Sequence, residues 1–267
     1  MFRPAIANQY EARCGVDKLL DSNALTLNIG NSFDLLSWKT EKTGKTVTGG
    51  NSGVNTQEWR IGTDLFTWTL INAEPDFRFP VEEVNYLFGL NATWMHTEQA
   101  SENALPVINS FRFRISHISC HTVDGMFDNY TQQFTYQEPF TFSEEFFDGL
   151  YSYQNSWNNA VAYRVLAGAK VLFHQIMPNT ITAFSPHYGL ELFLPPATIT
   201  PYLAYYGSMQ KITAWQGENE IQAGVKLGKW DAGGASAYIA YYQGKNVNGE
   251  LYILNASELS VGWNFSF

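Results

Sequence analysis

The stretch FRFRISHISCHTVDG, Phe111 to Gly125, holds the residue types that could perform chemistry. Read with a period of two, His117 and Ser119 fall on one face of an extended segment, and Arg112 and Arg114 fall on the other. Residues two apart on one strand face lie about 7 Å apart at Cα, so an imidazole can take the proton of a seryl hydroxyl. This pair therefore could provide the base and the nucleophile of a hydrolase.

Two other interpretations of the histidines are open. Polar residues near a strand end are also expected among lipid headgroups, where an interfacial position alone explains them. A metal site made by His117 and His121 is disfavoured, because same-face residues four apart on a strand are about 13 Å apart. The sequence predicts no metal and no cofactor, and it leaves open whether the protein is an enzyme.

A second group of ionisable residues is predicted to face the interior of a β-barrel. An arginine that faces lipid costs roughly 2–4 kcal/mol near the bilayer midplane, which favours the interior position. Because both signs of charge occur, the group could form an internal salt-bridge network that fills the barrel. Alternatively it could line a narrow pore whose basic excess favours small anions. Its members are Arg60, Asp64, Arg112, Arg114, Arg164, Lys170, Glu191 and Lys226, with Glu58 close to the first of them.

The composition indicates which elements position these side chains. Hydrophobic residues make up 45% of the 267 residues, aromatic residues 16% and charged residues only 15%. The usual charged share is roughly 25%, and no segment approaches the roughly 18 consecutive apolar residues of a membrane helix. Both facts agree for a transmembrane β-barrel, whose strands hide half of their residues in a polar interior. A secreted soluble β-sandwich is the other class left open.

Alternation of apolar and polar residues recurs along the chain, as expected for barrel strands of about ten residues. In the final segment, ELSVGWNFSF, residues Leu259, Val261, Trp263 and Phe265 share one face. Helical spacing appears nowhere at length. We predict an all-β fold, a closed antiparallel transmembrane β-barrel of about 12 strands. The strands are expected near 9–19, 24–38, 57–71, 83–96, 108–120, 141–153, 158–174, 184–194, 198–209, 219–229, 233–243 and 256–267.

An even strand number places both termini on the periplasmic side, where turns should be short and outer loops long. On this basis 194–197 is a periplasmic turn and 244–250 is an outer loop. The polar stretch 40–55 would also be periplasmic, although it is long. The stretch 40–55 would instead be an outer loop if 9–19 is not a strand and 121–140 contains an additional strand.

No linker or charge run divides the chain, so residues 1–267 are expected to form a single domain. The net charge of −9 argues against nucleic acid as a partner, because phosphate binding requires a basic stripe. Cys14 and Cys120 have no metal-ligand spacing; a disulfide is possible, and two free thiols are preferred. The start, MFRPAIANQY, lacks a basic region followed by an apolar core, so an export signal is expected to have been removed and a start Met added.

The expected location is the bacterial outer membrane, with membrane lipid around the barrel. Phe267 resembles the terminal aromatic residue that bacterial barrels present to the outer-membrane assembly machinery. The oligomeric state is left open. Tryptophans near the predicted strand ends are expected to form interfacial girdles; they are Trp38, Trp59, Trp94, Trp157, Trp215, Trp230 and Trp263.

The His-x-Ser spacing resembles that of outer-membrane phospholipase A and of lipid A deacylase, where a His-x-Ser-Asn run lies on the outer wall of a barrel. The resemblance implies that His117 is the base and Ser119 the nucleophile of a lipid-hydrolysing esterase. Cys120 stands where the Asn of these families is expected. Asp124 and Glu144 are the candidates for a group that orients the histidine.

Four pieces of the first two thirds of the chain resemble an uncharacterised bacterial outer-membrane family, a domain of unknown function. They are FRPAIAN, FRFRISHISCHTVDG, TFSEEFFDGLYSYQ and YRVLAGA. The resemblance implies that 121–140 is an outer loop and that His117 lies near the outer leaflet, and it implies no activity. The sequence therefore predicts a non-enzymatic outer-membrane barrel, a narrow channel for small solutes, with the lipid esterase as the alternative.

Overall fold

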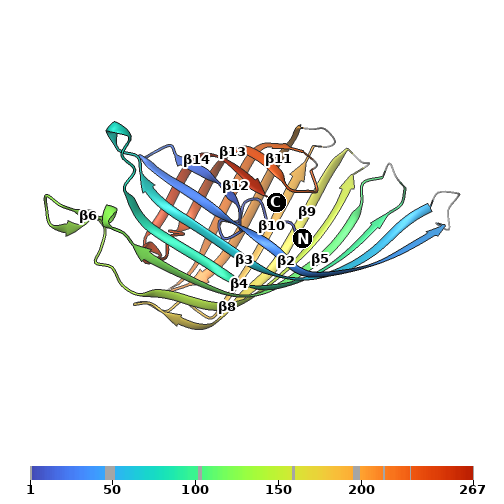
Figure 1. Cartoon of the computed structure of the whole chain (residues 1–267), viewed down its shortest axis with the longest axis horizontal. Coiled ribbons are helices and arrows are strands. Elements are labelled where there is room, and N and C mark those ends of the chain that lie inside the picture. Colours follow the sequence, from blue (N-terminus) through green and yellow to red (C-terminus); the bar gives the residue numbers. More distant parts are fainter. Residues whose placement is uncertain are drawn as a thin grey trace.

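A computed structural model gives the structure of the chain and describes residues 2–45, 52–101, 104–157, 160–194, 199–212, 214–228 and 230–266. Within these residues, twelve strands close into one antiparallel barrel (Figure 1). Its strands are β1 (Cys14–Leu19), β2 (Ala24–Lys45), β3 (Ser52–Asn72), β4 (Val81–Gln99), β5 (Val107–Thr122), β8 (Phe142–Trp157), β9 (Val161–Ile176), β10 (Phe184–Phe193), β11 (Ile199–Lys211), β12 (Trp215–Leu227), β13 (Gly234–Lys245) and β14 (Asn255–Ser266).

The connections hold the remaining regular structure. Two short strands, β6 (Phe127–Asp128) and β7 (Gln133–Phe134), pair only with each other between β5 and β8. The 3₁₀ turns η1 (Pro75–Phe77), η2 (Asp124–Met126) and η3 (Gly249–Leu251) lie between barrel strands. No helix in the described ranges is long and apolar enough to cross a membrane.

The prediction of a closed antiparallel barrel of 12 strands is confirmed. Strand β1 closes it by pairing with β14 on one side and β2 on the other. The predicted first strand, 9–19, is wrong in its first half, because the strand starts at Cys14 and the preceding residues lie inside the barrel. Strands β2 and β3 have 22 and 21 residues, and their hairpin extends past its neighbours at the right of Figure 1.

Pairing of Cys14 with Phe265 puts the start of β1 and the end of β14 at one end of the barrel, which we call the terminal end. Antiparallel order places the predicted stretch 40–55 at this same end, although residues 46–51 lie outside the described part. The alternative with an additional barrel strand in 121–140 is wrong, because β6 and β7 do not join the barrel. We call the opposite end the loop end. Phe267 lies outside the described residues.

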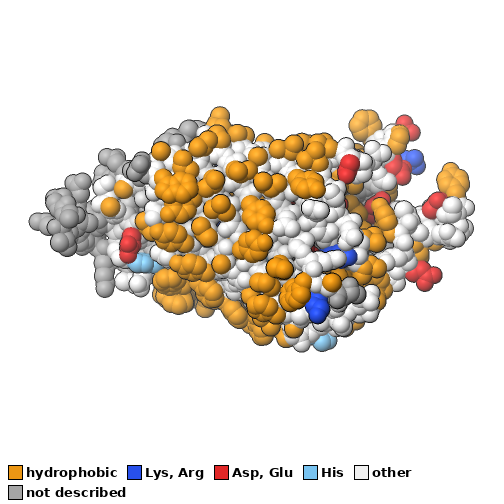
Figure 2. Space-filling model, turned by 180° about the vertical axis from the view of Figure 1, so that it is seen from behind, with side chains coloured by type: hydrophobic (Ala, Val, Ile, Leu, Met, Phe, Trp, Pro, Cys, Tyr) orange, Lys and Arg blue, Asp and Glu red, His pale blue; other side chains and the backbone are white. Residues whose placement is uncertain are grey.

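The outer wall is apolar. Hydrophobic side chains cover it in Figure 2, while charged side chains gather toward the two ends. Exposing apolar surface to water costs about 25 cal/mol per Å², whereas an outward apolar band is what a bilayer requires of a barrel. The fold is therefore a transmembrane β-barrel, and the soluble β-sandwich is wrong. One residue from each of six successive strands illustrates the band at 41–46% exposure: Val165, Leu190, Leu203, Ile221, Ile239 and Val261.

The interior combines polar side chains with two buried aromatic clusters. One cluster near the terminal end contains Phe193, Tyr202 and Trp230. Trp230 is 6% exposed and packs against Phe193, so its predicted place in an interfacial girdle is wrong. Both cysteines, Cys14 and Cys120, are free thiols.

Candidate functional site

Residues 2–13, which we call the plug, enter the lumen ahead of β1 (Figure 1). Phe2, Ala5 and Ala7 are buried in one hydrophobic cluster with wall residues such as Leu150. Small alanine side chains let the backbone of the plug pass close to the wall. These apolar contacts place the plug inside the barrel, so its charged residues must find partners there.

Glu11 docks the plug onto β5. Its two carboxylate oxygens accept hydrogen bonds from Arg112 at 2.5 and 2.8 Å, and all these atoms are buried. Arg114 lies 3.9 Å from the same carboxylate and donates to Asp148 at 2.9 and 3.0 Å. Burial alone would raise the pKa of Glu11, but Arg112 and Arg114 hold that pKa below its usual value.

Glu191 on β10 anchors the beginning of the plug. Its carboxylate accepts hydrogen bonds from the Arg3 guanidinium at 2.7 Å and from the Ile6 backbone N–H at 2.8 Å. Arg164 lies 3.3 Å from Glu191 and donates to the backbone carbonyls of Arg3 and Pro4 at 2.5 and 3.0 Å. Charges of the wall thus bind both side chains and backbone of the plug.

The eight predicted pore residues all lie on the inner side of their strands, but they do not form one ring. Arg112, Arg114, Arg164 and Lys170 each have a carboxylate partner, the last being Glu144 at 3.1 Å from Lys170. These carboxylate partners therefore neutralise the predicted excess of basic charge. The other predicted pore residues lie apart from these. Arg60 forms ion pairs with Asp34 and Glu58 at 2.5 and 2.8 Å. Asp64 accepts hydrogen bonds from Ser32 and Asn91, and Lys226 donates one to the Ala232 carbonyl.

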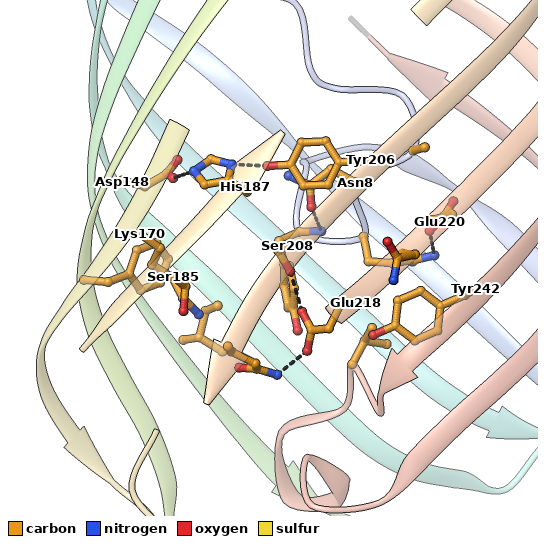
Figure 3. Close-up of a pocket in the computed structure, with 18 of the residues that line it drawn as sticks. Asn8, Asp148, Lys170, Ser185, His187, Tyr206, Ser208, Glu218, Glu220 and Tyr242 are labelled. Atoms are coloured by element: carbon orange, nitrogen blue, oxygen red, sulfur yellow. Dashed lines mark hydrogen bonds and ion pairs between the residues drawn. The ribbon is translucent and has the colours of Figure 1, made fainter. Parts of the chain in front are cut away.

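A cavity partly open to solvent, with about 70 Å³ of space for the centres of water molecules, remains between the plug and Val247 of the β13–β14 loop. Figure 3 shows His187 in its wall, between Asp148 and Tyr206. The His187 Nε2 lies 3.0 Å from an Asp148 oxygen, and Nδ1 is hydrogen-bonded to the Tyr206 hydroxyl. Gly168 makes room for this ring, because a Cβ there would lie 2.8 Å from it.

A polar cluster lies on the outer wall near the loop end. His117 on β5 has its Nδ1 2.6 Å from Glu145 on the neighbouring strand β8. The other oxygen of Glu145 lies 2.5 Å from Nδ1 of His174 on β9, and the Ser143 hydroxyl donates to Glu145 at 3.0 Å. We call these four residues the outer-wall cluster. Ser119 is half-exposed beside it, paired across the strands with Ser143.

The carboxylate beside His117 is therefore Glu145, which the sequence prediction missed. Glu144, its neighbour in sequence, is buried on the opposite face with Lys170. The side chain of Asp124, the second predicted candidate, lies outside the described part. No hydrogen bond joins Ser119 to His117 in the residues that the structure describes, so a bound substrate would have to bring them together. No group of three or more His, Cys, Asp or Glu side chains that could hold a metal occurs in the described ranges.

Comparisons with known proteins give a family and similar solved structures. The model of a family described as a protein of unknown function (DUF1207) matches residues 99–267. No curated protein matches the sequence. The crystal structure of the beta domain of the Bordetella autotransporter Brka is similar over 96% of this chain and 100% of that chain, with 13% sequence identity and a TM-score of 0.39.

Proposed function

The chain belongs to the DUF1207 family of unknown function, and we propose that it is a bacterial outer-membrane protein whose plugged lumen is a narrow, gated channel for small solutes. The plug carries this proposal. Barrels of about eight strands are filled by their own side chains, and barrels of about sixteen leave a wide channel. A lumen enclosed by twelve described strands lies between these limits, and here the plug fills the additional space.

The contacts of the plug suit a reversible closure. They are noncovalent, and several are buried ion pairs such as Glu11–Arg112 and Arg3–Glu191. The attraction within a buried pair is largely offset by the loss of hydration of both groups. Water that enters when the plug leaves would restore that hydration, so the net free energy of docking is smaller than the number of contacts suggests. The open lumen would then be lined by hydrated charges of both signs.

Conductance in planar bilayers tests the channel. We expect brief openings from the full chain and a steady current from a variant that lacks residues 2–13, because the lumen then contains water. A heat-dependent shift on a denaturing gel, seen for both proteins, shows that both barrels are folded. A folded deletion variant that carries no current would reject the channel. Separation of the inner and outer membranes of the source cell tests the location.

The outer-wall cluster favours a second candidate, hydrolysis of lipid esters. A carboxylate bonded to His117 Nδ1 fixes the tautomer in which Nε2 can accept a proton, and Glu145 lies 2.6 Å from Nδ1. The Ser119 oxygen would attack the ester carbonyl while its proton passes to His117 Nε2. The leaving alcohol takes that proton, and water then releases the fatty acid from the acyl-serine.

Release of fatty acid from phospholipid in mixed micelles tests this candidate. We expect Ser119→Ala to abolish it and Glu145→Gln to lower kcat roughly a hundredfold or more, because the histidine loses its orienting charge. Thr63→Ala, which removes a hydroxyl from the outer face of β3, two strands from β5 and outside the cluster, is the matched control. Hydrolysis that persists in Ser119→Ala would exclude Ser119 as nucleophile, and absence of hydrolysis by the unaltered protein would exclude the activity.

A further inference from the structure

The cavity beside the plug contains two carboxylates without a close ion-pair partner, although the charges of Arg13 and Lys170 act on them from further away. Glu218 and Glu220 lie two residues apart on β12, face the lumen and are 9% and 3% exposed. Glu218 accepts hydrogen bonds from the Ser208 hydroxyl at 2.8 Å and from Gln210, and Glu220 accepts one from Gln9. All these donors are neutral. In the described ranges neither carboxylate forms an ion pair with a lysine or arginine.

The other charges around the cavity are already paired. Lys170 lies 3.1 Å from Glu144, and Arg114 lies 2.9 Å from Asp148. The cavity therefore has a neutral side on β5, β8 and β9 and an acidic side on β12. A buried carboxylate without a cation is unfavourable, so a positively charged group that enters on the acidic side would be stabilised.

Aromatic rings surround the same space. Tyr10, Tyr206, Tyr242 and Phe146 all line the cavity. Ring faces attract cations, and Lys170 already illustrates this, with its Nζ 5.3 Å from the centre of the Phe146 ring and 5.9 Å from that of Tyr10. The rings also provide apolar surface for the body of a small molecule.

One buried hydroxyl in the cavity wall has no partner. Ser185 on β10 is 4% exposed, lines the cavity, and its Oγ makes no hydrogen bond in the described part of the chain. Figure 3 shows Ser185 and Glu218 on different strands, both beside the cavity. A buried polar group without a hydrogen bond is unfavourable. A polar group of a bound molecule would remove that cost.

We propose that this cavity binds a small organic ammonium compound. The ammonium group contacts Glu218 and Glu220, the apolar body lies among the tyrosines, and a hydroxyl or carbonyl at the far end bonds to Ser185. A neutral analogue leaves the carboxylates without a cation, and an anionic analogue adds repulsion. The plug lines this site in its docked position, so binding does not require the plug to leave and can be tested separately from the proposed channel.

Calorimetric titration of the full-length barrel in a neutral detergent tests the charge preference. The probes are tyramine, its neutral analogue 2-(4-hydroxyphenyl)ethanol, and the anion 3-(4-hydroxyphenyl)propanoate. We expect tyramine to bind at least about tenfold more tightly than the neutral alcohol, and the anion not to bind. Glu218→Gln should weaken tyramine about tenfold or more and leave the alcohol unchanged. Glu82→Gln, a buried carboxylate on β4 outside the cavity, should keep the affinity for tyramine.

A second variant tests the far end of the site. Ser185→Ala should lower the affinity for tyramine to that for phenethylamine, which lacks the hydroxyl, and leave phenethylamine unchanged. The heat-dependent gel shift confirms that each variant is folded. Equal affinity for tyramine and its neutral analogue, full binding by folded Glu218→Gln, or no binding of any probe by the unaltered protein would each overturn the proposal.

Discussion

Two segments fill the lumen from opposite ends, and different forces hold them. The plug is held largely by charge, as in the buried pair of Glu11 with Arg112. Residues 246–254 of the β13–β14 loop, which we call the cap, fold over the loop end and are held mainly by neutral donors. The one charged donor to the cap in the described part of the chain is Lys245, which donates to the Ile253 carbonyl at 2.7 Å. The Trp68 indole N–H donates to the Val247 carbonyl at 3.1 Å.

Asn85 holds the cap at two further points. Its side chain donates to Asn248 at 3.1 Å and accepts a hydrogen bond from the Gly249 backbone N–H at 2.8 Å. Gly249 is required for this approach, since a Cβ there would lie 2.6 Å from the Cys120 sulfur. Leu251 adds apolar contact and is 2% exposed. Even the one carboxylate of the cap that is buried, Glu250, accepts its hydrogen bonds from neutral groups.

Because of this difference, substitutions that remove a charge and substitutions that remove a neutral contact should act on different ends of the lumen. Removing a charge from the plug leaves another charge buried without a partner, which is costly. Removing a neutral contact from the cap costs only a hydrogen bond and its desolvation. The plug should therefore respond most to loss of a charge and the cap to loss of a neutral contact, and hydrogen exchange of their backbone amides can follow each one separately.

The largest effect is expected from Glu11→Ala. Arg112 loses its buried partner, so docking of the plug should weaken by about 3–5 kcal/mol. Amides of the plug should then exchange far faster, while those of the cap keep their protection. The heat-dependent gel shift monitors the barrel itself. Unchanged protection of the plug in this variant would contradict the assignment of Glu11 as one of its anchors.

Asn85→Ala should loosen the cap and not the plug, and the effect should be smaller than that of Glu11→Ala. Two hydrogen bonds to the cap are lost and a buried donor is left unpaired, at a cost of about 1–3 kcal/mol. Exchange should increase in the cap and stay unchanged in the plug. If both segments lose protection together, the two ends are coupled and the comparison between them fails.

The sequence predicts the barrel wall much better than what fills it. The strands of the second half follow from local alternation, since residues such as Leu259 and Val261 need only a period of two to reveal their outward face. The plug could not be predicted this way. Glu11 and Arg13 alternate like strand residues, and Arg112, the partner of Glu11, is 101 residues away in the chain.

The outer-wall cluster has a similar limit. Glu144 and Glu145 are adjacent in sequence and point to opposite faces, so a shift of one residue in register would exchange them. Only the pairing of His117 with Glu145 between β5 and β8 decides which carboxylate lies beside the histidine. The His-x-Ser spacing is visible in the sequence, whereas the group that orients the histidine depends on the assembled sheet.

Acid should weaken the docking of the plug, with a smaller effect than the two substitutions above. The pKa of docked Glu11 lies below the value of 4.5 of a free glutamate, with Arg112 and Arg114 as the cause and Arg13 and Asp148 also nearby. The stabilisation is therefore complete above pH 4.5 and is lost as the pH falls through the lowered pKa. Exchange of the plug amides should rise over that range. Glu11→Gln should remove this rise; a rise that persists in this variant would assign it to another group.

Salt should have the smallest effect on the plug. Added ions screen exposed charges over a Debye length of about 10 Å at 0.1 M and about 3 Å at 1 M, but they screen buried pairs much less. Glu11 and Arg112 are 2% and 3% exposed, so raising NaCl across that range should change the exchange of the plug amides little. Strong release of the plug by salt alone would mean that water and ions already reach the Glu11 carboxylate. The plug would then be held at a hydrated surface, and Glu11→Ala should lose most of its predicted effect, because a hydrated Arg112 needs no partner.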